Sequence, residues 1–220
     1  MNESLWQRQL SEGIAGMGLA LSADQQQQLL AFLALLNKWN RAYNLTAVRE
    51  PRQMVPRQLL DSLTLMPFLT ADRILDVGAG GGLPGIPLAI ACPGRQFTLL
   101  DSNSKKTRFL TQCKLELGLD NVEVIHGRAE DCQPSQPFEQ ISSRAFTALA
   151  NLVTWCDQLL SDKGQFLAMK GQFPDDEVSS LPAHWQLAEY HALDYPGRDG
   201  ERHLLVISRM SAPQDSTTGG

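Results

Sequence analysis

Long apolar runs are missing from this sequence. Nothing in its 220 residues has the length of a signal-peptide core or of a membrane-spanning helix. Hydrophobic residues nevertheless make up 43% of the chain, which is enough for a packed core. We expect a folded protein of the cytoplasm, a monomer that makes no contact with a membrane.

Metal-binding and disulfide patterns are missing as well. The four cysteines lie far apart and include no Cys-x-x-Cys pair: Cys92, Cys113, Cys132 and Cys156. No spacing typical of metal ligands relates the histidines His126, His184 and His191. These absences exclude a zinc finger and a disulfide framework, so we expect reduced thiols and no metal site.

An excess of positive charge is also missing, because the net charge is -5 at pH 7. A general nucleic-acid binder usually presents a basic face to phosphates, so this charge argues mildly against that class. Locally the balance is reversed, because the segment from Lys38 to Arg57 holds five basic residues and a single acidic one, Glu50. We expect Arg49, Arg52 and Arg57 to bind RNA there; the alternative is an ordinary solvated helix face.

Helical spacing of apolar residues dominates the first part of the chain. A helix is predicted over Ala23 to Tyr43, after the N-cap candidate Ser22, because leucines and aromatic residues recur there every three or four positions. Weaker helices are predicted over Ser4 to Gly16 and over Met54 to Leu65, the latter interrupted near Pro56. We expect residues 1–70 to form an N-terminal helical extension.

From Arg73 onward, short apolar runs alternate with helical segments, which is the pattern of a parallel sheet with crossover helices. Strands are predicted at residues 73–77, 96–100, 122–126, 140–142, 164–169, 186–192 and 203–208. No clear helix separates the last two, so we expect a hairpin at an antiparallel edge. The prediction is a Rossmann-like α/β domain over residues 71–210 with a mostly parallel sheet, then a disordered polar tail over residues 211–220.

A glycine-rich loop follows the first predicted strand and opens a helix: Asp76-Val77-Gly78-Ala79-Gly80-Gly81-Gly82-Leu83-Pro84-Gly85. In this context glycines permit close approach of the backbone to a ligand, and the helix N-terminus offers N–H groups to a carboxylate or phosphate. The loop, with Gly80 and Gly82, is therefore a candidate cofactor site.

Two cofactors compete for this loop. The glycines from Gly80 to Gly85 satisfy the dinucleotide pattern G-x-G-x-x-G, and Asp101 ends the next strand where a ribose-binding carboxylate belongs, which suits NAD. Asp76 favours S-adenosylmethionine, because a carboxylate there would repel a pyrophosphate and attract a sulfonium and an ammonium group. Glu130, after the third strand, adds a carboxylate where an adenine could be held. Three carboxylates at strand ends favour S-adenosylmethionine.

Further motifs lie outside the loop: Lys38-Trp39-Asn40, Tyr43-Asn44-Leu45-Thr46, Leu60-Asp61-Ser62, Leu99-Leu100-Asp101-Ser102, Ser143-Arg144-Ala145-Phe146, Lys170-Gly171 and Gly200-Glu201-Arg202-His203-Leu204. Together with the loop they resemble, over nearly the whole chain, the bacterial RsmG (GidB) family of small-subunit ribosomal RNA guanine-N7 methyltransferases. Several motifs in family order are more specific than any one of them.

The resemblance implies a class I methyltransferase fold with a seven-stranded sheet and S-adenosylmethionine as the cofactor. It also implies methylation of N7 of one guanine, guanine 527, in the 16S ribosomal RNA of the small ribosomal subunit. Carried over by motif, the cofactor contacts are Gly78, Leu83, Ala129, Glu130 and Arg144.

Guanine N7 has a lone pair and no proton, so methyl transfer to it needs position and charge rather than a general base. The sequence agrees, because after the fourth strand it has no Asn/Asp-Pro-Pro-Tyr/Phe segment and no cysteine that could attack a pyrimidine. Arg144 is a candidate for positioning cofactor or guanine, and Phe146 for stacking on an RNA base. The alternatives are a surface ion pair for Arg144 and a core position for Phe146.

Further cations fall at strand ends. Lys170 ends the fifth predicted strand, and Arg202 and His203 begin the last, so these three could meet phosphates or guanine O6. His203 has the alternative of an ordinary strand histidine. Two other functions stay open: an NAD-dependent oxidoreductase, and a non-catalytic ribosome-associated factor that keeps the fold.

Overall fold

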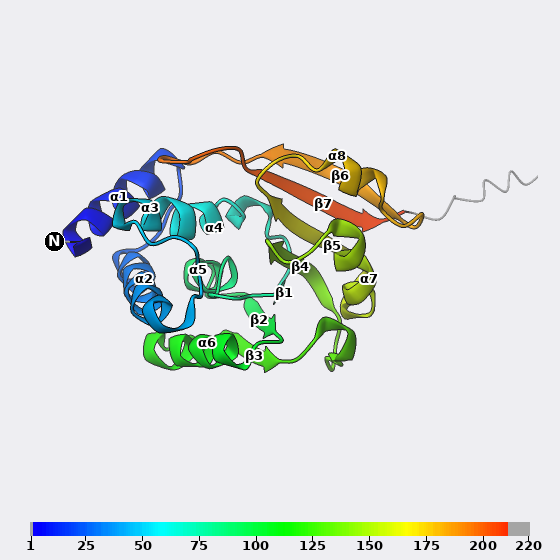
Figure 1. Cartoon of the computed structure of the whole chain (residues 1–220), viewed down its shortest axis with the longest axis horizontal. Coiled ribbons are helices and arrows are strands. Elements are labelled where there is room, and N and C mark those ends of the chain that lie inside the picture. The colour runs from blue at the N-terminus through cyan, green and yellow to red at the C-terminus, as the bar shows by residue number, and fades with distance from the viewer. Residues whose placement is uncertain (1, 211–220) are drawn as a thin grey trace, which may run out of the picture.

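A single sheet forms the centre of the molecule in a computed structural model that describes residues 2–210 (Figure 1). Its seven strands lie in the order β3-β2-β1-β4-β5-β7-β6. Their bounds are Arg73–Val77 (β1), Gln96–Asp101 (β2), Val122–His126 (β3), Phe138–Arg144 (β4), Leu160–Lys170 (β5), Trp185–Ala192 (β6) and His203–Arg209 (β7). Strands β1 to β5 pair in parallel, which confirms the predicted Rossmann-like α/β class.

The last two strands form the expected antiparallel pair, but the antiparallel strand is not at the edge. β7 lies between β5 and β6 and runs antiparallel to both, so β6 is the edge strand. Burial explains the order: the run from His203 to Ile207 is buried throughout, whereas most of β6 is exposed. An apolar run needs a neighbour on each side, and a half-polar strand suits an edge.

Helices precede the sheet and connect its strands. Their bounds are Asn2–Gly16 (α1), Ala23–Tyr43 (α2), Pro51–Met54 (α3), Asp61–Leu63 (α4), Gly85–Ala91 (α5), Ser104–Leu117 (α6), Leu149–Cys156 (α7) and Asp175–Ser179 (α8). Ser22 caps α2 as predicted: its hydroxyl accepts the N–H of Gln25, and the Gln25 side chain accepts the N–H of Ser22.

The interruption expected near Pro56 is a wide turn rather than a break. Residues Val55–Leu60 form a π-helix between α3 and α4, in which the N–H of Asp61 donates to the carbonyl of Pro56. Pro56 has no N–H of its own, and the wider turn accommodates that missing donor. The π-helix places Gln58 and Asp61 in the interior, where both are buried.

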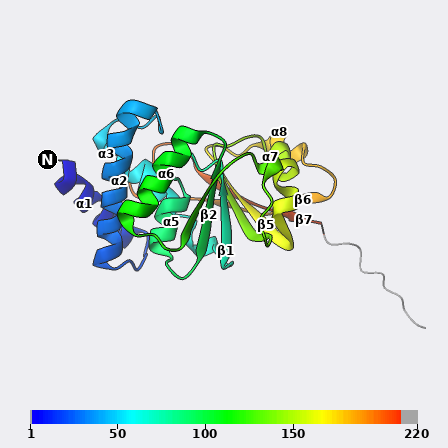
Figure 2. The same ribbon diagram turned by 90° about the horizontal axis from the view of Figure 1, so that it is seen from below.

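The two faces of the sheet belong to two different hydrophobic clusters, because side chains alternate along each strand. In β1, Ile74 packs in one cluster and Leu75 in the other. Helices α2, α5 and α6 cover the Ile74 face, and α7 covers the Leu75 face; Figure 2 shows these helices on either side of the strands.

The N-terminal helices are part of this packing. Phe32 and Leu36 of α2 share a cluster with Phe97 of β2 and Phe109 of α6. The boundary expected between residues 70 and 71 therefore crosses a continuous hydrophobic core, and a division into two domains stays a prediction. The expected tail, residues 211–220, lies outside the described residues.

Candidate active site

A cavity of about 250 Å³ opens at the carboxyl ends of β1 to β4, where open α/β sheets bind their ligands. We call it the central pocket. It is lined by residues from three expected sites, the glycine loop, the end of β2 and the turn after β3, and also from the turn after β4: Gly78, Asp101, Ala129, Glu130, Ala145 and Phe146.

The surroundings of Gly78 leave no room for a side chain at this position of the loop. Its φ is +67°, in the left-handed region that favours glycine, and a β-carbon there would overlap the ring of Phe146. Phe146 lines the central pocket and packs edge-on against Trp155, with 6.0 Å between ring centroids. The ring thus borders the glycine loop and the central pocket, next to Ala145, and the stacking role predicted for it stays a prediction.

The loop uses its backbone N–H groups internally. Gly78 donates to the carbonyl of Leu100 at 2.8 Å, Gly80 to Oδ2 of Asp101 at 2.9 Å, and Gly85 to Oδ2 of Asp76 at 2.9 Å. Gly82 donates to the carbonyl of Ala79 at 2.7 Å. The expectation that the loop and the helix after it offer free N–H groups to an anion is therefore wrong for these positions, and a pyrophosphate loses its usual donors.

Asp76 faces the interior of the loop and not the central pocket. Its carboxylate is fully buried, accepts the Gly85 N–H and accepts the hydroxyl of Ser142 at 3.1 Å. Burial raises the pKa of Asp76 to about 7, although the hydrogen bond from Gly85 opposes the rise. The direct electrostatic selection of a cationic ligand expected of Asp76 is therefore corrected: this carboxyl holds the loop in shape.

The wall of the central pocket carries both signs of charge. Asp101 and Glu130 line it, and so do Lys106 and Arg128. Asp101 is 5% exposed, and its Oδ2 lies 3.7 Å from Nζ of Lys106. The sequence predicted the carboxylates of this wall but not its two cations, and the mixed charge suits a ligand that itself carries both signs of charge.

Two of the expected loop contacts lie behind the pocket. Gly82 and Leu83 are buried, and neither lines the cavity. A β-carbon on Gly82 would meet Ile86 and Leu110, so this glycine allows the loop to pack on α5 and α6. Ala129 is buried at the start of a short turn, Ala129–Asp131, that carries the exposed Glu130.

A second cavity of about 330 Å³ lies between the N-terminal helices and the ends of β4, β5 and β7. We call it the basic pocket, because four cations line it: Arg57, Arg144, Lys170 and Arg202. The structure thus brings together three of the four residues expected to position the substrate, and it adds Arg57. The two pockets meet at Ala145, which lines both and has a φ of +54°.

Asp61 is the centre of the basic pocket. It is fully buried and binds two arginines, with Oδ2 at 2.9 Å from Nη1 of Arg144 and Oδ1 at 3.0 Å from Nε of Arg202. Gln58 accepts a hydrogen bond from Arg144 at 3.1 Å and donates to the hydroxyl of Thr46 at 2.6 Å.

The sequence did not predict the contacts that hold Arg144 and Arg202 in place. Asp61 appears there only inside the motif Leu60-Asp61-Ser62, with no role. Its partner Arg202 lies 141 residues away along the chain, and no local spacing predicts such a contact. The available signal was the motif itself, because Asp61 is the single acidic residue in the predicted helix from Met54 to Leu65.

Lys170 and His203 have different surroundings, although they are paired across β5 and β7. Nζ of Lys170 lies 2.8 Å from Oε2 of Glu177 and donates to the carbonyl of Thr147 at 3.2 Å. His203 does not line the basic pocket; it is buried against the rings of Phe173 and Tyr190. The role of His203 at the cationic rim is therefore corrected in favour of the ordinary strand position.

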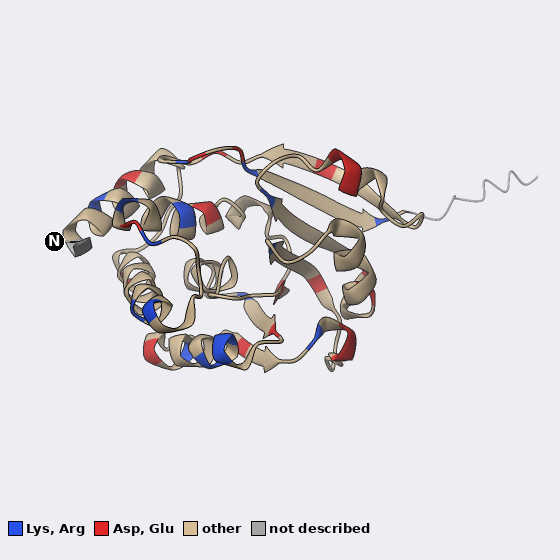
Figure 3. Ribbon diagram, viewed as in Figure 1, with Lys and Arg blue, Asp and Glu red and all other residues tan. Residues whose placement is uncertain are grey.

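The basic segment before the sheet divides between two places. Arg49 and Arg52 are exposed, and Arg49 donates to the Asn44 side chain at 2.6 Å. Arg57 is half-buried and lines the basic pocket. Lys and Arg of α2, α3 and α6 gather in the left half of Figure 3, on the part of the molecule that carries Arg49 and Arg52.

The cysteines and the possible metal ligands of the described residues form no further site. All four cysteines are free, and burial raises the pKa of each, to about 12 for Cys156. Within residues 2–210, no group of three or more acidic, histidine or cysteine side chains could hold a metal ion. None of the helices described is both long and apolar enough to cross a membrane.

Comparison with known proteins places this arrangement in a family. Residues 25–205 match the model of the GidB family, described as rRNA small subunit methyltransferase G. The ribosomal RNA small subunit methyltransferase G of Marinobacter nauticus is 72% identical over 209 residues, which cover 95% of this chain and 98% of that protein. The protein of the same name from Pseudomonas syringae is 55% identical, over 93% of this chain and 95% of that one.

A solved structure shows the same fold at much lower identity. The precorrin-6y C5,15-methyltransferase of Geobacter metallireducens superimposes with a TM-score of 0.52 at 14% identity, over 77% of this chain and 92% of that one. The residues that match the family model and those aligned with the two relatives include both pockets. The chain belongs to the GidB family of small-subunit ribosomal RNA methyltransferases.

Proposed function

We propose that the protein transfers a methyl group from S-adenosylmethionine to N7 of a guanine in 16S ribosomal RNA, at guanine 527 by family resemblance. One observation carries the proposal: the central pocket and the basic pocket meet at Ala145, at the end of β4. A donor held in the first and a nucleotide held in the second would be in contact there, and such proximity supplies much of the rate of a two-substrate reaction.

The central pocket fits S-adenosylmethionine better than NAD. The methyl donor carries a sulfonium, an ammonium and a carboxylate, and the pocket wall carries Asp101 and Glu130 as well as Lys106 and Arg128. Gly78 gives the backbone close access to the ligand. The N–H groups of Gly80 and Gly85, which would have to bind a pyrophosphate, already donate to carboxylates of the chain.

When bound, S-adenosylmethionine supplies a methyl group on a sulfonium, which a lone pair displaces in line. Guanine N7 offers that lone pair without losing a proton, so the chain needs no general base. The basic pocket is consistent with this, because both oxygens of Asp61 are committed to arginines and Glu177 is committed to Lys170.

The arginines of the basic pocket position the nucleotide in this mechanism. Arg144 and Arg202 are each held by Asp61 and remain about one-fifth exposed, so they keep donors free for a phosphate or for guanine O6. Lys170 adds a cation at the end of β5. The chain's own contribution is thus placement and electrostatic complementarity.

The experiment that tests this function uses labelled S-adenosylmethionine and ribosomal RNA from cells that lack the modification, both as free RNA and in small subunits. We expect label in one guanine, mapped by primer extension. Calorimetry with NAD should show no binding. An oxidoreductase would bind NAD and transfer no methyl group, and a non-catalytic factor would bind subunits without labelling them.

Arg49 and Arg52 are proposed to hold the RNA backbone outside the basic pocket, with Arg57 at its rim. Changing all three to Ala should weaken RNA binding. The slope of the logarithm of the binding constant against the logarithm of the salt concentration should become shallower by about one unit for each lost phosphate contact. Affinity for S-adenosylmethionine should stay constant. RNA affinity that is unchanged at every salt concentration would contradict this role. We also propose that the enzyme acts on 16S ribosomal RNA as a monomer in the cytoplasm.

A further inference from the structure

An aromatic surface lies between α2 and α6, near both pockets: Tyr43 ends α2 three residues before Thr46 of the basic pocket, and Lys106 of α6 lines the central pocket. Trp39 packs on Tyr43 with 5.3 Å between ring centroids and on Phe109 with 5.5 Å. Tyr43 is nevertheless 45% exposed, which makes it one of the few large apolar side chains that face solvent among the residues described. Trp39 also lines a hollow of about 420 Å³ with Arg108 and His126. We call Trp39, Tyr43 and this hollow the aromatic shelf.

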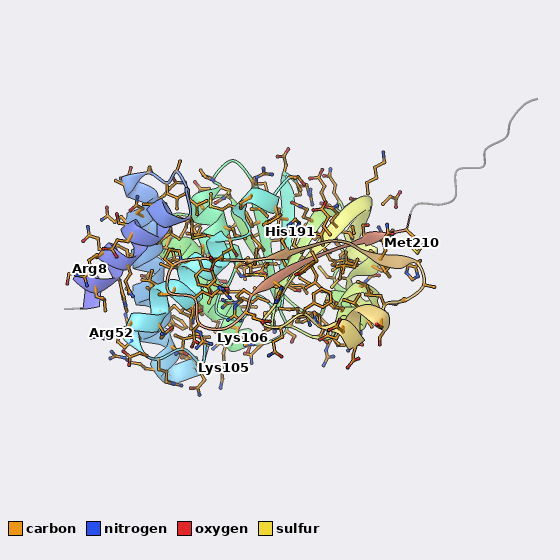
Figure 4. All side chains as sticks on the ribbon, turned by 90° about the horizontal axis from the view of Figure 1, so that it is seen from above. Arg8, Arg52, Lys105, Lys106, His191 and Met210 are labelled. Carbon is orange, nitrogen blue, oxygen red and sulfur yellow. The ribbon has the colours of Figure 1, made fainter. Side chains whose placement is uncertain are left out.

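Exposed cations lie on both helices that carry the shelf. Lys38 and Arg41 are on the last turns of α2, and Lys105 and Arg108 lie one turn apart on α6. Within residues 2–210, none of these four makes an ion pair. Lys106, by contrast, is paired with Asp101. Figure 4 labels Lys105 and Lys106 along the same side of the molecule as Arg52 of the basic segment.

The shelf adjoins the central pocket on its α6 side. Nε2 of His126 lies 3.1 Å from the carbonyl of Ser102, and Ser102 lines the central pocket. On α6, Lys106 lines the central pocket and the next two residues line the hollow. Thr46 and Val48, just after Tyr43, line the basic pocket, so RNA with its target nucleotide there could follow residues 44–48 to the shelf while the donor occupies the central pocket.

We infer that the aromatic shelf binds an unpaired base of the RNA substrate, close to the nucleotide that is methylated. Unpaired bases stack on aromatic side chains, and their phosphates bind neighbouring lysines and arginines, so one occupant satisfies both features of the surface. An apolar peptide would leave the four cations without partners. The inference rests on the proposed function, because it takes RNA as the substrate.

Four variants test the shelf: Tyr43→Leu, Tyr43→Phe, Arg108→Ala and, as a matched control, Lys163→Ala. Lys163 is an exposed cation in the first half of β5, away from the carboxyl edge of the sheet. Tyr43→Leu should weaken RNA binding about tenfold, because it removes one stacking partner, and Tyr43→Phe should retain the affinity. Arg108→Ala should weaken binding and reduce its salt dependence by about one unit. Lys163→Ala should change neither.

A direct readout separates stacking from a merely structural role. The fluorescent base 2-aminopurine is placed in turn at unpaired positions that flank the methylated guanine, and we expect one position to be quenched by the unaltered protein and by Tyr43→Phe but not by Tyr43→Leu. If Tyr43→Leu binds RNA as tightly as the unaltered protein and quenches each 2-aminopurine position as strongly as that protein does, the shelf is not a base-binding surface, whether or not methyl transfer is intact. If the unaltered protein transfers no methyl group to RNA, the proposed function itself fails, and the inference falls with it.

Discussion

Gly78 is the residue at which loop geometry and ligand binding meet most directly. An Ala at its φ of +67° costs about 1–2 kcal/mol from the backbone alone, and the added methyl group overlaps the ring of Phe146. We expect Gly78→Ala to lower the affinity for S-adenosylmethionine at least about tenfold. Calorimetry measures this, and Gly94→Ala is the control, because a β-carbon on Gly94 meets no atom within 4 Å. Equal affinities in the two variants would contradict the account of the loop.

Asp76 makes stability depend on pH in a defined direction. Its pKa is about 7 in the folded protein, above the ordinary value of 3.8, so the folded state holds the proton more tightly than the unfolded state. The associated stability is present at low pH and is lost as pH rises through this interval, until the loss is complete above about 7.

Asp76→Asn removes that dependence, because the amide oxygen can still accept the N–H of Gly85 and its NH₂ group can donate to Ser142. The melting temperature of the variant relative to the unaltered protein should rise as pH increases from about 5 to about 8. Ser142→Ala is a useful companion, because it keeps the acid and removes one hydrogen bond. A difference in melting temperature that stays constant with pH would refute the assignment.

The residues of the site differ in how far the sequence could predict them. The positions of Gly78, Asp101 and Glu130 at the central pocket follow from strand ends, because parallel strands end at one edge of the sheet. The direction of a side chain does not follow in the same way. Asp76 also lies near this edge, but its carboxylate accepts the N–H of Gly85. That contact depends on how the glycine loop turns back, which the sequence does not show.

At the scale of elements, the π-helix Val55–Leu60 joins the N-terminal helices to the basic pocket. Gln58 in this π-helix and Asp61, the first residue of α4, contact Arg144 at the end of β4 and Arg202 just before β7. Removing one partner of a buried ion pair typically costs about 3 kcal/mol of the free energy of unfolding. Asp61→Asn should therefore lower the melting temperature and, because it releases both arginines, raise the KM for RNA.

The measurement compares Asp61→Asn with Asp72→Asn, which alters an exposed carboxyl near the start of β1. The affinity of both variants for S-adenosylmethionine should match that of the unaltered protein, because Asp61 does not line the central pocket. Asp61→Glu should recover part of the RNA KM. A normal KM for Asp61→Asn at a temperature where it is folded would exclude this positioning role.

Elements with regular spacing were predicted closely, and those that depend on distant contacts were not. The bounds of α2, β1 and β3 coincide with the prediction, because apolar periodicity and a cap define them locally. β4 and β5 extend beyond the predicted segments, since Phe138 pairs with Leu160 across the two strands, outside the short apolar runs that the prediction used. The apolar run of β7 is consistent with a position inside the sheet, but its pairing with β5 on one side and β6 on the other depends on distant contacts that local sequence does not encode.

At the scale of the whole molecule, the N-terminal helices and the sheet share one core. Leu29, Phe32, Leu33 and Leu36 are fully buried in the cluster that contains Phe97 and Leu99 of β2. A fragment of residues 71–210 would expose that surface to water, and a Phe or Leu side chain loses about 1.5–3 kcal/mol when it is uncovered. We expect the fragment to bind hydrophobic dyes and to melt without a cooperative transition, measured by circular dichroism and dye fluorescence. A fragment that melts cooperatively and binds S-adenosylmethionine would instead establish two domains.

The bond between Asp61 and Arg202 also sets an order of events during synthesis. Every residue that lines the central pocket precedes residue 156, whereas Arg202 lies just before the final strand of the sheet along the chain. A growing polypeptide could thus form the donor cavity well before the nucleotide cavity closes. Incomplete products that stop before residue 202 would sequester the donor without modifying a ribosome, so the enzyme becomes competent only when nearly all of it has emerged.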